Sequence, residues 1–419
     1  MRMCMENILP SEIILEILSR LPADSVLQCR QVCKTWRNLL RHPSFAHMHL
    51  CQLSQPHENN YRSQSTVVVL GFLLSLHFSN EHGTQLYYGE YDSQPDKKLR
   101  RINQPPIHHS IVGSCNGLIC ISEFEWFYRV NEPLYICNPV TGEYINFPRL
   151  KIITGNKVDL MVCGFGYDSF VKKYKIVRIY YIKDQPLGRV QVYTLGGGGY
   201  SGWRDVGEVT CSLRLSHSSY PSQYRSTFGV FANGAVHWLD NEERIVFINL
   251  ADEKLYLLPS PPFVRAAGSQ NTYQLHLLGG CLCFGHHKRN DCLDIWFLRK
   301  KDESSIRDMS EMEYDSSGWS KKFSIAIEDR AEPFALTNSG EVLLHYARSI
   351  FCYDPRTRTL EKIVSDGVRV CRAIPHANSF VSLKALGEKC KFRKRYDINP
   401  AAKVITIRQR RKDNGAIDA

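Results

Sequence analysis

The segment from Leu9 to Leu40 constrains the fold of this chain more than any other stretch. Its apolar residues recur every three or four positions, which predicts a helix that begins near Pro10 and stops before Pro22. A second and a third short helix follow and end before Pro43. So small a unit buries a low fraction of its surface, and apolar side chains left on its outside need a partner. The alternative is a three-helix cap whose apolar residues all face its own core.

The pairs Leu9-Pro10 and Leu21-Pro22, the run Val32-Cys33-Lys34 and Trp36 form a dense pattern in this segment. That pattern resembles the F-box, the module that docks a substrate receptor onto the Skp-type adaptor of a cullin-RING ubiquitin ligase. Cys29 departs from it, because many F-boxes have an aromatic residue there. The pattern also includes Lys34 and a closing Phe45. The resemblance implies an adaptor interface and its supporting core at ten residues, without separating the two roles: Leu9, Pro10, Ile14, Ile17, Leu21, Pro22, Leu27, Val32, Cys33 and Trp36.

The length of 419 residues exceeds a usual single domain, so we expect one large domain after this helical module. The content of 21 Tyr, 19 Phe, 27 Gly and 19 Pro favours strands and turns, which predicts a mainly β body. The expected division is a helical module at residues 1–50, a linker at 51–65, a β domain at 66–387 and a basic tail at 388–419.

A unit of Gly turn, strand, loop and strand recurs within the β domain. It begins at Gly113, Asn233 and Asn338, and each copy ends in Asn or Asp, which indicates an irregular β-propeller; an open β-sandwich is the alternative. We count five units, and a sixth would join the strands after Thr66 to a late strand at residues 379–383. Such closure would remove exposed strand edges.

Three motifs of the β domain lie at residues 113–118, 136–142 and 164–168. Their order resembles the F-box-associated domain of plant F-box proteins, over roughly residues 110 to 360. The resemblance implies a β domain that recognises a substrate, and it brings no catalytic residues with it.

The net charge of +11 is concentrated at the ends, with +2 in residues 1–50 and +6 in residues 388–419. The nearly neutral body argues against nucleic-acid binding. Two basic clusters in the tail are spaced like a bipartite nuclear-import signal, and a solvated tail is the alternative. The clusters consist of Lys391, Arg393, Lys394, Arg395, Arg408, Arg410, Arg411 and Lys412.

The longest apolar run, residues 66–78, is too short to cross a bilayer, and the first residues lack a signal-peptide pattern. We therefore expect a cytoplasmic or nuclear protein without a membrane partner. Its 15 Cys would stay reduced in that compartment. They are odd in number and scattered along the chain, which does not indicate a disulfide framework.

Catalytic and metal motifs are incomplete in this sequence. It contains no serine elbow, H-E-x-x-H or P-loop motif. The cysteines and histidines between Cys281 and Cys292 lack zinc-ribbon spacing, so we expect neither a metal nor a cofactor. The adjacent aromatic residues Trp126, Phe127 and Tyr128 are candidate anchors for a target, or else pack alternately on the sheet.

The leading hypothesis is a non-catalytic substrate receptor, which holds a Skp-type adaptor and, through it, a cullin, while the β domain holds an unidentified target protein. Proximity then lets a separate enzyme modify the target. One alternative is a propeller-type enzyme such as a glycan hydrolase, with acids such as Asp168, Asp205 and Asp294. The other is an F-box protein that acts outside the ligase as a scaffold.

Overall fold

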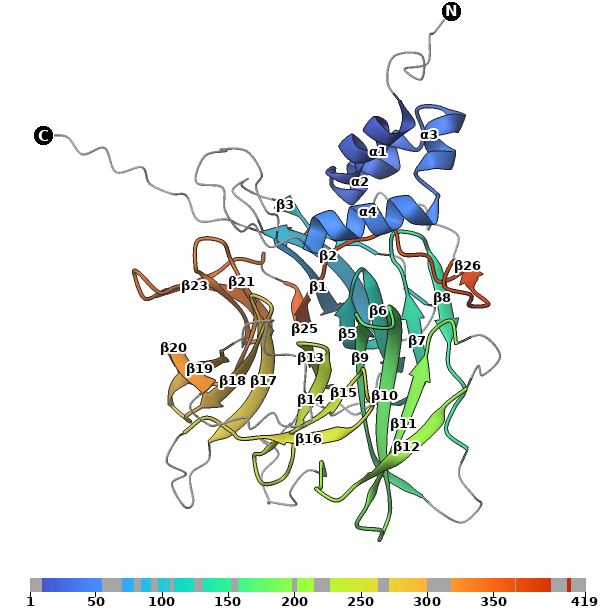
Figure 1. Cartoon of the computed structure of the whole chain (residues 1–419). Helices are drawn as coiled ribbons and strands as arrows, with labels where there is room; N and C mark the ends of the chain where they lie inside the picture. The colour runs from blue at the N-terminus through green and yellow to red at the C-terminus, as the bar shows by residue number, and fades with distance from the viewer. Residues whose placement is uncertain are drawn as a thin grey trace, which may run out of the picture.

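The computed structural model describes most of the helical module and of the β domain. The described residues are 10–54, 70–78, 84–91, 97–102, 104–105, 109–123, 131–151, 157–197, 202–214, 227–262, 271–299, 318–365, 367–392 and 405–407. Helices gather at the N-terminal end of the molecule, and strands form the rest (Figure 1). No helix in the described part is long and apolar enough to cross a membrane.

The described residues form four helices, one more than the sequence predicts: α1 (Ser11–Ser19), α2 (Ala23–Cys29), α3 (Lys34–Leu39) and α4 (Pro43–Ser54). Pro10 and Pro22 stand in extended conformation directly before α1 and α2, as expected of residues that start a helix. Cys33 caps α3, because its Sγ accepts the backbone N–H of Trp36 at 3.4 Å. The helix α4 continues to residue 54, whereas the sequence predicts that the linker begins at residue 51.

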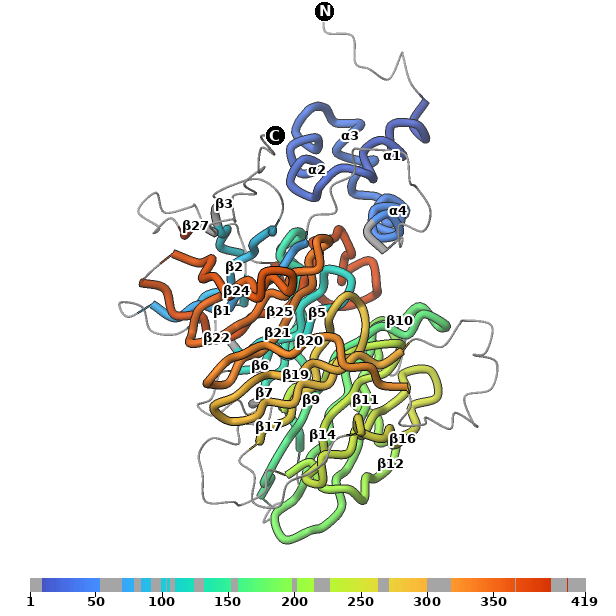
Figure 2. The backbone as a smooth tube through the Cα atoms, turned by 90° about the vertical axis from the view of Figure 1, so that its left-hand side faces the viewer, coloured from blue at the N-terminus to red at the C-terminus, as the bar shows by residue number. Residues whose placement is uncertain are grey.

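Six antiparallel sheets, which we call blades 1 to 6, surround a common axis in the described part of the chain (Figures 1 and 2). This is the predicted propeller, and the sandwich alternative is not needed. Blade 1 contains β1 (Leu70–His77), β2 (Thr84–Tyr91) and β4 (Arg100–Arg101), with β25 (Arg369–Pro375) beside β1. Blade 2 contains β5 (His109–Cys115), β6 (Leu118–Glu123), β7 (Asn131–Cys137) and β8 (Glu143–Asn146).

The other four blades are each built from consecutive strands. Blade 3 contains β9 (Val158–Asp168), β10 (Lys173–Ile182), β11 (Gly188–Thr194) and β12 (Arg204–Val209). Blade 4 contains β13 (Val230–Ala232), β14 (Ala235–Leu239), β15 (Ile245–Asn249) and β16 (Leu255–Leu258). Blade 5 contains β17 (Thr272–Leu278), β18 (Cys281–His287), β19 (Asp291–Leu298) and β20 (Trp319–Ile327). Blade 6 contains β21 (Ala331–Leu336), β22 (Val342–Tyr346), β23 (Ser349–Asp354) and β24 (Thr359–Lys362).

The late strand β25 closes the ring, because it pairs antiparallel with β1 and so joins the two ends of the β domain. The closing strand predicted at residues 379–383 is wrong, since that segment forms no strand. Two short late strands, β26 (Lys391–Phe392) and β27 (Thr406–Ile407), pair with β8 and with β3 (Lys97–Lys98). Parts of the region predicted as a tail are therefore paired with the β domain.

The repeated turn chemistry read from the sequence has a direct structural cause. Asn116 and Asn233 adopt φ of 50° and 49°, and the glycine after each is also left-handed, as a tight hairpin requires. The Asn or Asp at the end of the third strand accepts the backbone N–H two residues further on in blades 2, 4 and 6. In each blade the distance is 2.8 Å, from Oδ1 of Asn138, Asn249 and Asp354.

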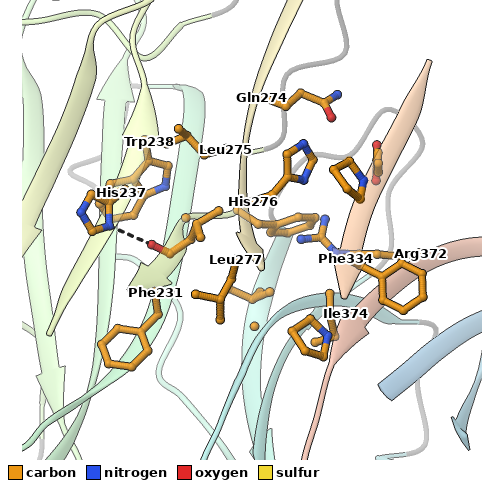
Figure 3. A pocket seen from close by; sticks show the side chains of 18 of the residues that line it. Phe231, His237, Trp238, Gln274, Leu275, His276, Leu277, Phe334, Arg372 and Ile374 are labelled. Carbon is orange, nitrogen blue, oxygen red and sulfur yellow. Dashed lines mark hydrogen bonds between the residues drawn. The ribbon is translucent and has the colours of Figure 1, made fainter. Parts of the chain in front are cut away.

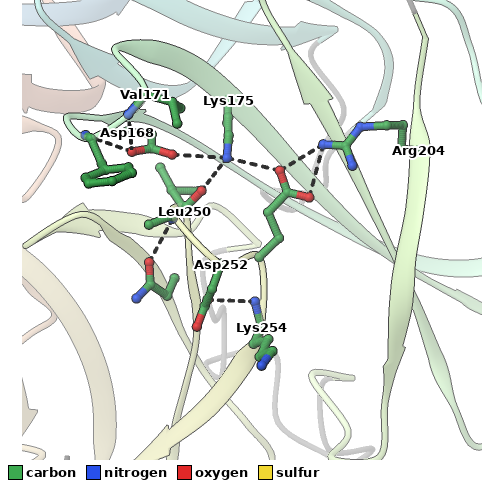
Figure 4. A network of polar contacts seen from close by, with 11 residues as sticks. Asp168, Val171, Lys175, Arg204, Leu250, Asp252 and Lys254 are labelled. Atoms are coloured by element: carbon green, nitrogen blue, oxygen red, sulfur yellow. Dashed lines mark hydrogen bonds and ion pairs between the residues drawn. The ribbon is translucent and has the colours of Figure 1, made fainter. Parts of the chain in front are cut away.

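A buried ion network joins blades 3 and 4 (Figure 4). Lys175, only 6% exposed, places Nζ 3.1 Å from Asp168 Oδ2 and 3.0 Å from Glu253 Oε1, and it donates to the Leu250 carbonyl. Burial alone would raise the pKa of Glu253, but hydrogen bonds from Arg204 and Lys175 lower it below its usual value. The charge of Lys175 is thus compensated across the boundary between the blades.

Candidate functional site

The helical module sits on one end of the propeller, with α4 next to the strands and α1 to α3 further out (Figure 1). The core of the module contains side chains from α1, α2 and α4, among them Ile14, Val26 and Phe45. It also contains Phe380 and Val140, which belong to the β domain. The β domain therefore completes a core that the helices alone would leave open.

Phe380 is the principal contact from the β domain, and 3% of it is exposed. Its ring centroid lies 5.7 Å from that of Phe45 and 5.0 Å from that of His49, which meets it edge-on. The Arg30 guanidinium lies 4.4 Å from the ring centroid and also donates to the Leu40 carbonyl. Burial lowers the pKa of His49 below its usual value, so this ring is neutral near pH 7.

The segment that carries Phe380 is fastened to blade 2. The Asn138 side chain donates to the carbonyls of Ser379 and Val381, at 3.1 and 2.7 Å. The backbone N–H of Leu383 donates to Glu143 Oε2 at 2.7 Å. These bonds explain why residues 379–383 form no strand, because their backbone groups are bonded to side chains of blade 2. Phe380 is consequently held in place from both sides.

The outward face of the module retains large apolar side chains. Ile13 is 46% exposed and Ile17 is 51% exposed, one turn apart on α1, and Val32 is 67% exposed after α2. Of the predicted adaptor residues, Pro10, Ile17, Pro22 and Val32 are exposed, and Ile14 is buried. Leu21, Leu27 and Trp36 are half-buried and pack on the core, and Cys33 caps α3. Leu9 lies outside the described residues.

Two of these positions differ from the sequence reading. Their spacing of three predicts that Ile14 and Ile17 share one apolar stripe of the helix, but α1 turns Ile14 inward and Ile17 outward. Ile13 was missed, although its spacing of four from Ile17 marks a second apolar face. The remaining predicted anchors Trp126, Phe127 and Tyr128, and the basic residues Arg393, Lys394, Arg395, Arg408, Arg410, Arg411 and Lys412, lie outside the described residues. Lys391 is exposed in β26 and donates to Asn146 at 3.2 Å.

A cavity of about 150 Å³ lies on the propeller axis (Figure 3). The innermost strands of all six blades contribute to its wall, from β5 around to β25. Phe231, Leu277 and Ile374 form part of an apolar region, while Gln274, His276 and Arg372 bring polar groups into the same space (Figure 3). A largely apolar cavity with a few polar side chains is typical of sites for small organic ligands.

The polar part of the cavity is charged. Arg330 and Glu332 form an ion pair at 2.8 Å, with side chains 22% and 24% exposed. Burial alone would raise the pKa of Glu332, but Arg330, His345 and Arg372 lower it far below its usual value, so it is ionised near pH 7. The Arg372 guanidinium lies 4.4 Å from the Phe228 ring centroid. Burial lowers the pKa of His276 to about 4, so its ring is neutral.

Residues considered for metal binding or catalysis have structural partners. His286 contacts Asn271, and His287 contacts the Asp329 carbonyl at 2.7 Å. The described residues contain no group of three His, Cys, Asp or Glu that could hold a metal ion. The acids of the enzyme hypothesis have partners within the protein. Asp168 pairs with Lys175, Asp205 accepts a hydrogen bond from Gln191, and Asp294 pairs with Lys288 and Lys321. None of these contacts needs a substrate.

Comparison with protein families matches the two parts of this architecture separately. Residues 7–48 match the F-box domain, and residues 69–384 match the F-box associated beta propeller domain. The chain belongs to the F-box-associated β-propeller family. Its six blades and its N-terminal helices are thus the two parts of one family architecture, as the sequence resemblance implied.

Relatives of this F-box-associated propeller protein occur in Arabidopsis thaliana. "F-box protein At3g07870" is 26% identical, over 86% of this chain and 88% of the relative. "F-box/kelch-repeat protein At3g23880" is 24% identical over 87% and 92%, and "F-box protein CPR1" is 25% identical over 76% and 73%. A solved lectin from Aleuria aurantia covers 73% of this chain and 96% of its own, with 10% identity and a TM-score of 0.32, too low to support an argument.

Proposed function

We propose that this protein is the substrate-recognition subunit of a Skp-cullin-F-box ubiquitin ligase. The helical module binds the Skp-type adaptor and, through it, a cullin, while the propeller binds a target protein. The protein itself is a non-catalytic receptor that brings the target near the conjugating enzyme in the cytoplasm or nucleus. Trp126, Phe127 and Tyr128 are proposed target anchors, and the two basic clusters from Lys391 to Lys412 are a proposed import signal.

One observation carries this proposal. The family assignment joins an F-box to a propeller, and in this chain the F-box keeps Ile13, Ile17 and Val32 exposed on the side away from the core. Exposed aliphatic side chains on a module whose inner face is already covered support a partner on the outer face. Phe380 covers the inner face, which supports the outer face as the adaptor-binding surface.

The test is binding of a purified Skp-type adaptor to the full chain, measured by calorimetry. Ile17→Arg should weaken adaptor binding by at least about 30-fold, because a charge would enter an apolar interface. Leu257→Arg is the matched control, since Leu257 is an equally exposed aliphatic residue on β16 of blade 4 (56% exposed).

The proposal fails if the full chain does not bind the adaptor, or if Ile17→Arg binds it as well as Leu257→Arg does. Adding the cullin to the preformed complex of this chain with the adaptor tests whether the complex also binds the cullin. A complex that holds the adaptor but excludes the cullin would favour a scaffold outside the ligase.

A further inference from the structure

The helix α2 lies in the outer layer of the helical module, further from the propeller than α4 (Figure 1). The inner helix α4 packs on the propeller, with Phe45 against Phe380 and Leu50 against a core of blades 2 and 3. At the C-terminal end of α2, the Arg30 guanidinium lies 4.4 Å from the Phe380 ring centroid. Contacts gathered at one place resist separation better than they resist rotation about that place. A second, distant contact is therefore needed to fix the tilt of α2.

The other end of α2 makes such a contact with a different blade. Asp24 lies in the first turn of α2, and its carboxylate accepts a hydrogen bond from the guanidinium of Arg100. Arg100 belongs to β4, the outermost strand of blade 1, whereas the segment that carries Phe380 is fastened to blade 2. Asp24 and Arg30 are six residues apart, which is about 9 Å along a helix. The β domain thus contacts α2 near both of its ends.

The side chain of Arg100 is held by the strand beside it. Its Cζ lies 5.2 Å from the ring centroid of Tyr88, and its Nη2 lies 3.7 Å from Glu90 Oε1. The Tyr88 hydroxyl donates to the same Glu90 oxygen at 3.0 Å. Tyr88 is only 6% exposed, and its ring meets that of His376, directly after β25, edge-on. A guanidinium positioned in this way loses less side-chain freedom when it binds Asp24 than an unsupported arginine would.

The ion pair between Arg100 and Asp24 is suited to orientation rather than to stability. Each side chain is 43% exposed, and ion pairs at that exposure contribute little to the free energy of unfolding. The core around Phe380 does not include this pair, so the module should stay folded without it. Loss of the pair should instead release the corner between α1 and α2, which carries the exposed residues Ile17 and Pro22.

We propose that Arg100 is a positioning residue, which together with Phe380 fixes the tilt of the helical module and so sets the direction of its exposed face relative to the propeller. This orienting role stands on the geometry of the chain alone. Its consequence for ubiquitin transfer rests on the proposed ligase function. A fixed tilt sets the distance between a target on the propeller and the conjugating enzyme beyond the adaptor, and transfer depends on that distance.

The test measures distances between module and propeller in the full chain by pulsed electron paramagnetic resonance. Spin labels are attached to a ketone-bearing amino acid introduced at two exposed positions, Thr35 on α3 and Glu208 on β12, so that the native cysteines stay in place. The wild type should give one narrow distance distribution. Arg100→Met and Asp24→Ala should each make it at least about twofold wider. Arg101→Met is the matched control, since Arg101 is the next residue on β4 and is exposed, and it should leave the width unchanged.

Charge exchange separates this contact from a general effect on folding. Arg100→Glu alone should widen the distribution, and Arg100→Glu combined with Asp24→Arg should narrow it again, because the pair is restored in reverse order. All of these variants should keep the urea midpoint of the wild type. The proposal is overturned if Arg100→Met keeps the narrow distribution while folded, or if the exchanged pair is as wide as Arg100→Glu alone.

Adaptor binding measured on the same variants keeps this proposal apart from the ligase role. Arg100→Met should bind the adaptor within about twofold of the wild type, because the exposed face of the module is unchanged. A chain whose distribution widens in Arg100→Met but which does not bind the adaptor would support the positioning contact and refute the ligase role. A chain that binds the adaptor but keeps its narrow distribution in Arg100→Met would refute the positioning contact alone.

Discussion

Replacement of Phe380 by alanine should release the helical module from the propeller without unfolding the blades. The lost side chain is 3% exposed and contacts Phe45, His49 and Arg30. Truncation of a buried phenylalanine costs about 3–5 kcal/mol, and the lost cation–π contact is part of that cost. A unit of the size of this module has a total stability of only about 2–7 kcal/mol, so the loss is comparable with all of it.

Hydrogen exchange monitored by mass spectrometry measures this effect by region. Amides of α1 and α4 should exchange roughly a hundred to several thousand times faster in Phe380→Ala, which is the rate equivalent of 3–5 kcal/mol. Amides of β14 and β15 should keep the wild-type rate, because they lie in blade 4, away from the module. Phe392→Ala is the matched control, since Phe392 lies in β26 and is 63% exposed.

Phe380→Leu separates volume from ring chemistry. Leucine restores most of the buried apolar area but offers no ring face to Arg30, so it should recover most of the protection of α1 and α4. If Phe380→Ala leaves the exchange of α1 and α4 unchanged, the argument that the propeller completes the core of this module is refuted.

Two further perturbations test the interior of the propeller. Lys175→Met should lower the free energy of unfolding by about 3–5 kcal/mol, because it leaves the buried carboxylate of Asp168 without its cation. Arg204→Met is the control and should cost less than about 1 kcal/mol, because Arg204 is half exposed. Urea denaturation of both variants measures the two free energies. Lowering the pH from 7 to 5 should remove about 2 kcal/mol of stability for each of His237 and His376. Burial lowers the pKa of both rings to about 4 in the folded chain, whereas their pKa in the unfolded chain is near 6.5. As the pH falls from 6.5 towards 4, the unfolded chain therefore binds protons that the folded chain does not, and the folded state loses stability. Urea midpoints measured at both pH values check this result. His237→Gln should lose less stability on acidification than the wild type.

Local chemistry made much of this fold predictable. The propeller follows from repeated turn residues, because Asn116 and Asn233 with their glycines specify tight hairpins, and the Asn or Asp after the third strand bonds its own backbone. The helical module follows from its density of apolar and proline positions. These signals all act over a few residues, which is why they are visible in the sequence.

Contacts between distant segments could not be predicted in the same way. The run at residues 379–383 is apolar like a strand, yet bonds from Asn138 and Glu143 engage its backbone and direct Phe380 into the helices. The cavity is equally hidden, because Arg330, directly before β21, and Arg372, on β25, line it together only in the closed ring. Helical periodicity marks Ile13 and Ile17 as one face, but it does not say that this face is left open.

The position of Phe380 in the chain links the closure of the propeller to the helical module. Phe380 follows five residues after β25, the strand that pairs with β1 and closes the ring. The segment that leaves the closing strand thus supplies a core residue to the N-terminal module. The helical module and the closing end of the propeller therefore share one core, beneath the face on which Ile17 and Val32 are exposed. Since β25 also carries Arg372, one continuous segment lines the cavity, closes the ring and completes the core beneath the proposed adaptor surface.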